Sequence, residues 1–297
     1  MSIISIPRCA VVVGGGGALG QEISQQLKAE GIATISLERS SLEASLDISE
    51  LKVVIEKLNP SAIVNCIAIT GLDKCFLDPI RAFEVNGIFA IKLACISKIL
   101  KVPVLQFSTD NVFSCDVKGV LYRETDDPKP ATVYGMSKLL GEACKIRTNA
   151  PFYVVRLPLL FGPSNRNQII HRFIKQIIKG IDIRVSSDVF STPVYTPDVA
   201  DFTVKWVKGK IQIGSVTHLT SGQLTTLHDL VVSISDKIAC NGKGMVLAAS
   251  SSEFSSVEAK PLHGGLASEL IPTIDLESAI TRYGEWIESN LKEIINE

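Results

Sequence analysis

A run of glycines directly after a short apolar segment constrains this chain more than any other feature. Three valines at 11–13 lead into it, and Gly14, Gly17 and Gly20 give a G-x-x-G-x-x-G spacing. Backbone without Cβ atoms can turn tightly and approach a pyrophosphate, and the N–H groups of a following helix can bind it. Glycines also make plain turns. Because this run follows a strand-like segment and opens a helical stretch, it predicts cofactor-phosphate contacts at Gly14, Gly17 and Gly20.

Through the first two-thirds of the chain, short apolar segments alternate with amphipathic helical stretches. This alternation is typical of βαβ units, whose helices cover both faces of a parallel sheet. We expect strands at 9–13, 32–37, 62–67, 102–107 and 152–156. We expect helices at 21–30, 51–58, 79–100 with a break near Gly87, and 133–147. The sequence therefore predicts an α/β fold, a Rossmann-like doubly wound parallel sheet with a smaller C-terminal lobe.

The alternation weakens after Gly162, and a helix is expected at 171–179. We expect an NAD(P)-binding Rossmann domain over residues 1–160 and a smaller substrate-binding lobe over residues 161–297. A helix at 198–207 and a strand at 216–219 are expected to return to the main sheet. Segments near 192–220 would then belong to the first domain, so the boundary is not a single cut.

The composition argues against several classes of protein. With 30 basic and 31 acidic residues the formal net charge is -1, so no global positive field would attract nucleic acid or anionic lipid. The seven cysteines and four histidines are scattered, which indicates reduced thiols and no metal site. No segment is apolar for long enough to cross a bilayer, and the glycine run interrupts any N-terminal signal peptide. We expect a cytoplasmic protein that binds neither nucleic acid nor membrane.

The residues after the second expected strand bear on the choice of cofactor. Glu38 lies 18 residues after Gly20, close to the usual position of an acid that binds the ribose hydroxyls. Arg39 follows at once, and an arginine there can hold the 2′-phosphate of NADP instead. Both could also be solvated loop charges. Further on, Asp47 and Ile48 could contact the adenine, or Asp47 could cap the next helix. We expect NADP, with NAD left open.

Three residues indicate catalysis of carbonyl reduction. Tyr134 and Lys138 lie four residues apart on an expected helix, hence on the same face. A phenol has an ordinary pKa of about 10, and a neighbouring ammonium lowers it towards the working range. Thr109 follows the fourth expected strand, at the edge where open parallel sheets bind ligands. The alternatives are a strand-end cap for Thr109 and a surface lysine for Lys138.

Longer motifs accompany these residues, in an order that resembles one known family. They are the glycine run, Leu46-Asp47-Ile48, Val64-Asn65, Thr70-Gly71-Leu72-Asp73-Lys74, Val85-Asn86, Ser108-Thr109-Asp110, Tyr122-Arg123-Glu124-Thr125-Asp126 and the segment from Val133 to Glu142. Over about residues 8–230 the chain resembles the extended short-chain dehydrogenase/reductases, and specifically the dTDP-4-dehydrorhamnose reductase family.

The resemblance implies NAD(P)H-dependent reduction at C4 of a deoxy-ketosugar that is carried on a nucleoside diphosphate. Tyr134 would give the proton to the forming alkoxide. Lys138 would lower the pKa of the tyrosine and hold the nicotinamide ribose, and Thr109 would orient the carbonyl. Besides the three glycines, the expected cofactor contacts are Ala18, Leu19, Arg39, Asp47, Ile48, Ala68, Thr70, Tyr134 and Lys138.

The expected substrate contacts are Asp110, Asn111 and Arg156, and here the chain departs from the family pattern. Asn111 stands where the family usually has an aromatic residue. The family's Arg-Thr-Ser-Trp segment is matched by Arg156-Leu157-Pro158-Leu159, without the aromatic that would pack on the sugar. Its late Arg-Pro-x-Asn-Ser motif is matched only by Lys260-Pro261-Leu262-His263-Gly264. Arg156 could equally be a structural ion-pair partner.

Two other functions fit the same scaffold. The first is a sugar-nucleotide epimerase; a dehydratase is disfavoured, because Asn111 cannot transfer the proton that dehydration needs. The second is a cofactor-binding regulatory subunit without turnover. The segment from Arg156 to Gly162 is similar to that of the methionine adenosyltransferase beta subunit, a non-catalytic relative. A homodimer is considered, although no expected helix marks an interface.

Overall fold

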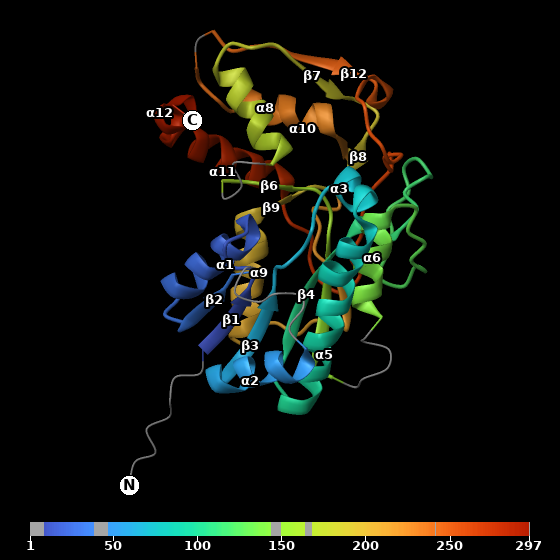
Figure 1. Ribbon diagram of the computed structural model, residues 1–297. Helices are drawn as coiled ribbons and strands as arrows, with labels where there is room; N and C mark the ends of the chain where they lie inside the picture. Colours follow the sequence, from blue (N-terminus) through green and yellow to red (C-terminus); the bar gives the residue numbers. More distant parts are fainter. Residues whose placement is uncertain (1–8, 39–46, 144–149, 164–167, 241, 297) are drawn as a thin grey trace.

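The computed structural model describes residues 9–38, 47–143, 150–163, 168–240 and 242–296. In this part of the chain, a 6-stranded parallel sheet has the strand order β10-β5-β4-β3-β1-β2 (Figure 1). The strands are β1 (Cys9–Val13), β2 (Thr34–Leu37), β3 (Pro60–Asn65), β4 (Val104–Thr109), β5 (Phe152–Leu157) and β10 (Val216–His218). The predicted Rossmann-like parallel sheet is confirmed.

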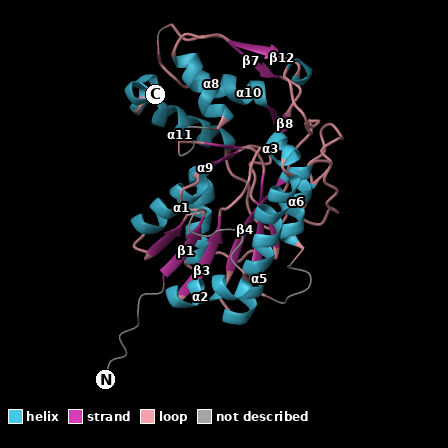
Figure 2. Ribbon diagram, viewed as in Figure 1, coloured by secondary structure: helices cyan, strands magenta, loops and turns pink. Residues whose placement is uncertain are grey.

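Helices cover both faces of this sheet, as Figure 2 shows. Successive side chains of a strand point to opposite faces. Val12 therefore packs with Ile23 of α1 (Ala18–Ala29) and with α9 (Thr196–Val207), while Val13 packs with Leu51 of α2 (Ile48–Leu58) and with α5 (Phe89–Leu100). α6 (Val133–Glu142) lies beside α5. Among the described residues, no helix combines the length and the apolar composition that crossing a membrane requires.

The element boundaries differ from the expected ones where the chain turns into the site. α1 begins at Ala18, three residues before the expected start, because the turn ends at Gly17. The helix expected over 79–100 has three parts, α4 (Pro79–Ala82), the π-helix η1 (Phe83–Ile88) and α5. The break expected near Gly87 is thus a widened turn of helix. The helix expected over 133–147 is described to Ala143, and the residues 144–149 lie outside the described chain.

The lobe beyond the sheet has an apolar core of its own. Its helices are α8 (Ile169–Ile178), α10 (Leu227–Asp236), α11 (Leu276–Ser289) and α12 (Leu291–Asn296). Three short strand pairs complete it: β6 (Leu160–Phe161) with β9 (Val194–Tyr195), β7 (Ile183–Ser186) with β12 (Val246–Ala249), and β8 (Phe190–Ser191) with β11 (Thr225–Thr226). Ile174, Ile234 and Tyr283 are buried together there. α9 and β10 return to the sheet between these segments, and the domain boundary itself stays a prediction.

Candidate active site

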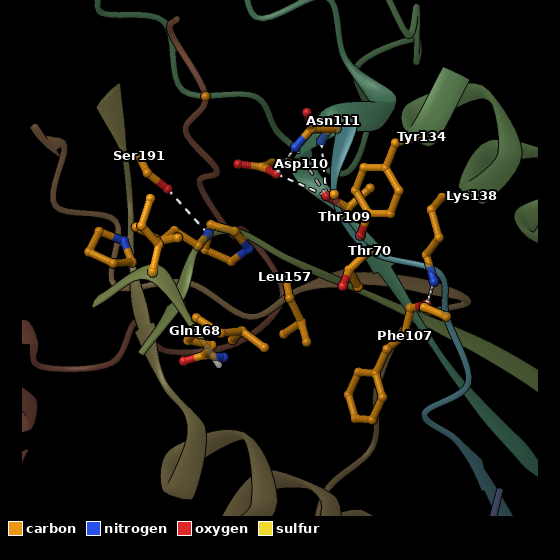
Figure 3. Close-up of a pocket in the computed structure, with 18 of the residues that line it drawn as sticks. Thr70, Phe107, Thr109, Asp110, Asn111, Tyr134, Lys138, Leu157, Gln168 and Ser191 are labelled. Carbon is orange, nitrogen blue, oxygen red and sulfur yellow. Dashed lines mark hydrogen bonds between the residues drawn. The ribbon is translucent and has the colours of Figure 1, made fainter. Parts of the chain in front are cut away.

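A cavity of about 590 Å³ lies at the carboxyl ends of the strands, between the sheet and the lobe. Residues that follow β1, β3, β4 and β5 line its sheet side, and the start of α8, β8, β11 and the segment 260–264 line its lobe side (Figure 3). Between β1 and β3 the connections change direction along the sheet. Open parallel sheets bind their ligands at such a point.

The first turn of α1 presents backbone donors to this cavity. Gly17 is the N-cap, no side chain caps the helix, and the first turn holds no acidic residue. Gly17, Ala18, Leu19 and Gly20 line the cavity. A Cβ on Gly20 would lie 2.3 Å from the carbonyl oxygen of Gly14, whose φ is +82°, so both positions require glycine. The first N–H groups of a helix have no partner within it, so this turn fits the pyrophosphate of a dinucleotide.

The loop after β3 forms the next part of the wall, and a buried asparagine of the π-helix holds it. Asn86 accepts a hydrogen bond from the N–H of Ile69 at 2.8 Å and donates to its carbonyl at 3.1 Å. The same side chain donates to Ser137 Oγ of α6 at 2.9 Å. Ala68 and Thr70, two of the expected cofactor contacts, line the cavity in this loop. In the sequence Asn86 stands out only as part of the Val85-Asn86 motif, and its role in holding this loop was not predicted.

Among the expected cofactor contacts that the structure describes, Gly14, Asp47 and Ile48 do not line the cavity. Asp47 is the N-cap of α2, where its side chain accepts from the N–H groups of Ser49 at 2.7 Å and Glu50 at 2.9 Å. Neither Asp47 nor Ile48 lines the cavity. Arg39 lies outside the described residues. The capping alternative for Asp47 is therefore observed, and its contact with an adenine stays a prediction.

Glu38 lies over the glycine run. A Cβ on Gly16 would be 2.1 Å from a carboxylate oxygen of Glu38, so the acid and the turn are in close contact. A carboxylate beside a phosphate-binding turn can accept from ribose hydroxyls and repels a 2′-phosphate. The sequence led us to expect NADP, and the choice between NADP and NAD stays a prediction.

The three expected catalytic residues lie near one another in the wall of the cavity, as Figure 3 shows. Thr109 ends β4, and Tyr134 and Lys138 lie one turn apart on α6. Lys138 is 4% exposed, and its Nζ donates to the carbonyl oxygen of Phe107 at 2.7 Å. The N-cap Thr132, which accepts from the N–H of Gly135 at 3.1 Å, fixes the start of the helix.

Burial governs the protonation of both helix residues. It raises the pKa of Tyr134 above its ordinary value, and a hydrogen bond with Thr109 opposes this rise. Burial lowers the pKa of Lys138 to about 8, against an opposing effect of Glu142. The expectation that the lysine lowers the pKa of the tyrosine is not met here. Loss of hydration disfavours the charged form of both groups. The ammonium of Lys138 donates its hydrogen bond to the carbonyl oxygen of Phe107 and not to the phenol.

Thr109 belongs to a small polar network at the end of β4. Its Oγ1 donates to Asp110 Oδ1 at 3.0 Å, and Asn111 Nδ2 donates to the same carboxylate oxygen at 2.9 Å. Asp110 is buried, and burial raises its pKa. Asp110 and Asn111 both line the cavity, where they can contact a substrate.

Arg156 does not take part in this site, so its assignment to the substrate is wrong. It is 3% exposed, does not line the cavity, and pairs with Glu142 through Nη2 and Oε2 at 2.7 Å. Its Nη1 lies 3.3 Å from Nε2 of His218, and its guanidinium lies 5.0 Å from the ring centre of Phe113. Glu142 is one turn beyond Lys138 on α6, so the arginine is the structural ion-pair partner that the sequence left as an alternative.

The lobe side of the cavity contains residues that the sequence reasoning did not assign. Phe190, Lys260 and Gly264 line it. Among the described residues, the charged side chains in the lining are Asp110, Lys138 and Lys260. In the sequence only the Lys260-Pro261 pair pointed to this side of the cavity, because it matches part of the family's Arg-Pro-x-Asn-Ser motif. Phe190 lies in a two-residue strand, which is too short to show a pattern.

Comparisons with known proteins agree with this geometry. The family model described as RmlD substrate binding domain matches residues 9–296. The spore coat polysaccharide biosynthesis protein SpsK of Bacillus subtilis (strain 168) is 27% identical over 288 residues, which are 97% of this chain and 96% of that protein.

Two solved structures share the fold over nearly the whole chain. The dTDP-4-dehydrorhamnose reductase of Clostridium acetobutylicum has a TM-score of 0.83 and 25% identity, with 94% of this chain and 99% of that chain covered. The dTDP-4-dehydrorhamnose reductase of Bacillus anthracis, in complex with NADP, has a TM-score of 0.84 and 23% identity at the same coverage.

Proposed function

Because the chain belongs to the RmlD substrate binding domain family, we propose that it is an NAD(P)H-dependent reductase of a 4-keto nucleotide sugar. One observation carries the proposal: a single cavity joins the uncapped first turn of α1 to Thr109, Tyr134 and Lys138. The dTDP-4-dehydrorhamnose reductase of Clostridium acetobutylicum, whose fold this chain shares, supports the substrate class.

Residues 17–20 and the loop 68–70 would hold a nicotinamide cofactor, which would supply the hydride. Tyr134 gives its phenolic proton to the carbonyl oxygen as that oxygen gains charge. Since burial raises the pKa of Tyr134, the phenol is protonated at neutral pH and ready to donate. Lys138, held at Phe107, supplies positive charge behind the phenolate that this transfer leaves.

Thr109 orients the carbonyl through its hydroxyl. That hydroxyl has one proton, which it donates to Asp110 in this structure. Binding a ketone therefore requires the hydroxyl to turn from the carboxylate to the substrate oxygen. Asn111 stays bonded to Asp110 and keeps the carboxylate in place during this exchange.

A panel of 4-keto nucleotide sugars tests the proposal. Purified protein with NADPH or NADH is incubated with dTDP-, UDP-, GDP- and CDP-linked ketosugars, and the absorbance of the reduced cofactor is followed. We expect oxidation with at least one sugar. Tyr134→Phe should lower kcat by on the order of 10²–10⁴-fold, because it removes the acid. Tyr153→Phe is the matched control, since Tyr153 packs against Trp206 outside the cavity lining.

The same panel separates the alternative functions. Tight cofactor binding without turnover of any sugar would overturn the proposal in favour of a regulatory subunit. A product formed with no net change of the cofactor would indicate epimerisation. The cytoplasmic location and the homodimer remain predictions, and sedimentation of the purified chain tests the second.

A further inference from the structure

We propose that Glu258 is a positioning residue for the catalytic helix, which it connects to the lobe segment that lines the substrate side of the cavity. The inference rests on the proposed function, because it gives Glu258 a part in the same reaction. We call residues 254–264 the strap.

Glu258 binds the first residue of α6. Its Oε1 accepts a hydrogen bond from the backbone N–H of Val133 at 2.8 Å, and Tyr134 is the next residue. α6 has no acidic residue in its own first turn, so a carboxylate 125 positions away complements its N-terminus. Glu258 is 8% exposed, so water competes little with this contact. A carboxylate placed in this way stabilises a helix start.

The second carboxylate oxygen of Glu258 indicates that this residue has a role beyond packing. Oε2 is buried and has no hydrogen-bond partner in the described part of the chain. A buried acceptor without a partner costs free energy, and a charged one costs more. A side chain kept for packing alone would not carry a polar group at this cost.

A second acid fixes the strap beside α6. Oδ1 of Asp73, on α3 (Leu72–Leu77), accepts from Ser256 Oγ at 2.9 Å and from the N–H groups of Val257 at 2.9 Å and Glu258 at 3.2 Å. Leu72, one residue before, lines the cavity. The strap is thus attached to the helix that begins at the cofactor side of the cavity as well as to α6.

Beyond Glu258 the strap reaches the cavity. Lys260, Pro261 and Gly264 line the cavity. A Cβ on Gly264 would lie 2.9 Å from Asp110 Oδ2, so glycine allows the strap to approach the end of β4. A nucleotide sugar that contacts Lys260 is therefore two residues from the carboxylate that holds the start of the Tyr134 helix.

Steady-state kinetics with two substitutions test the inference. Glu258→Ala removes the bond to Val133, whereas in Glu258→Gln the amide oxygen can still accept it. We expect Glu258→Ala to lower kcat about tenfold and to raise KM for the sugar nucleotide severalfold, with the Kd of the reduced cofactor unchanged. Glu258→Gln should keep most of the wild-type rate. Glu269→Ala is the matched control, an exposed acid of the same C-terminal segment.

Hydrogen exchange gives a readout that does not depend on turnover. In Glu258→Ala, the amides of the first turn of α6 should exchange faster than in the wild type or in Glu258→Gln. If Glu258→Ala does not fold, Asp73→Ala, which releases the strap from α3, should show a smaller change in the same direction.

Unchanged kcat and KM in Glu258→Ala, or unchanged exchange in α6, would overturn the inference. A loss of cofactor affinity as large as the loss of kcat would also overturn it, because the damage would then be general. If the wild type reduces no ketosugar, the proposed function fails, while the exchange measurement still decides whether the strap holds the helix.

Discussion

In the cavity, burial favours the neutral forms of Tyr134 and Lys138. Tyr134 keeps its phenolic proton, and Lys138 loses its proton more readily than an exposed lysine does. The pKa of Tyr134 is raised and that of Lys138 is lowered to about 8. Asp110 shares the same buried setting, and its pKa is raised as well. Each shift disfavours the charged form of the group, which is the effect of removing water.

The lowered pKa of Lys138 predicts the basic limb of the pH profile. We expect kcat to fall as the pH rises through about 8, because the ammonium that stabilises the phenolate is then lost. Lys138→Arg should move this limb to higher pH, since a guanidinium stays charged, even if the maximal rate is lower. Lys57→Arg, an exposed lysine on α2, serves as control. A limb that stays at the same pH in Lys138→Arg would assign it to another group.

The same shift has a consequence for stability. The folded state disfavours the proton on Lys138, so the cost is fully present below about pH 8 and is relieved as the pH rises towards the ordinary value of 10.5. Over this interval the unfolded chain holds more protons, and the contribution of this group to the free energy of unfolding increases with pH.

Among the elements, α6 and the π-helix η1 approach each other closely at two glycines. These contacts fix the position of Tyr134 and Lys138 on α6. A Cβ on Gly141 would lie 2.6 Å from the backbone oxygen of Asn86. A Cβ on Gly87 would lie 2.6 Å from Cδ2 and 2.9 Å from Cγ of Leu140, which are side-chain atoms. Backbone cannot move aside as a leucine methyl can. The close approach at Gly141 therefore sets the distance between the helix of Tyr134 and the asparagine that holds the loop after β3.

Substitution of the two glycines should give different results. We expect Gly141→Ala to lower the free energy of unfolding by about 1–3 kcal/mol and to lower kcat, because the helix is pushed from its neighbour. Gly87→Ala should cost less than Gly141→Ala, since rotation of Leu140 relieves part of the contact and alanine favours the helix by about 1 kcal/mol. Urea denaturation and kinetics of both variants check this. Equal losses in the two variants would show that the backbone contact is not decisive.

Across the whole molecule, a buried polar network connects the sheet, the catalytic helix and the C-terminal segment. Arg156 of β5 pairs with Glu142 of α6 and contacts His218 of β10. Nδ1 of His218 faces the carbonyl oxygens of Tyr122 at 3.2 Å and Ala267 at 2.9 Å. Burial lowers the pKa of His218, so the ring is neutral at pH 7, donates through Nδ1 and accepts from the arginine at Nε2.

A double-mutant cycle measures this connection. Arg156→Ala should cost about 3–5 kcal/mol of unfolding free energy, because it leaves the buried Glu142 without its partner. Arg156→Ala with Glu142→Ala should cost less than the sum of the two single changes. KM for the sugar nucleotide should change little in the Arg156 variant if it folds, since the arginine does not line the cavity. Arg123→Ala, an exposed pair with Glu269, is the control. Additive effects in the cycle would contradict the coupling.

The sequence by itself determined the parallel sheet, the turn at Gly14–Gly20 and the placement of Tyr134 and Lys138 on one helix face, because these depend on local spacing and on the alternation of apolar residues. Only the tertiary structure decided what those residues contact. In the folded protein, Arg156 pairs with Glu142 and Lys138 donates a hydrogen bond to the carbonyl oxygen of Phe107. Glu258 accepts a hydrogen bond at the start of α6. Such contacts join positions far apart in the chain. The burial that shifts the pKa values exists only once sheet and lobe have packed together around the cavity.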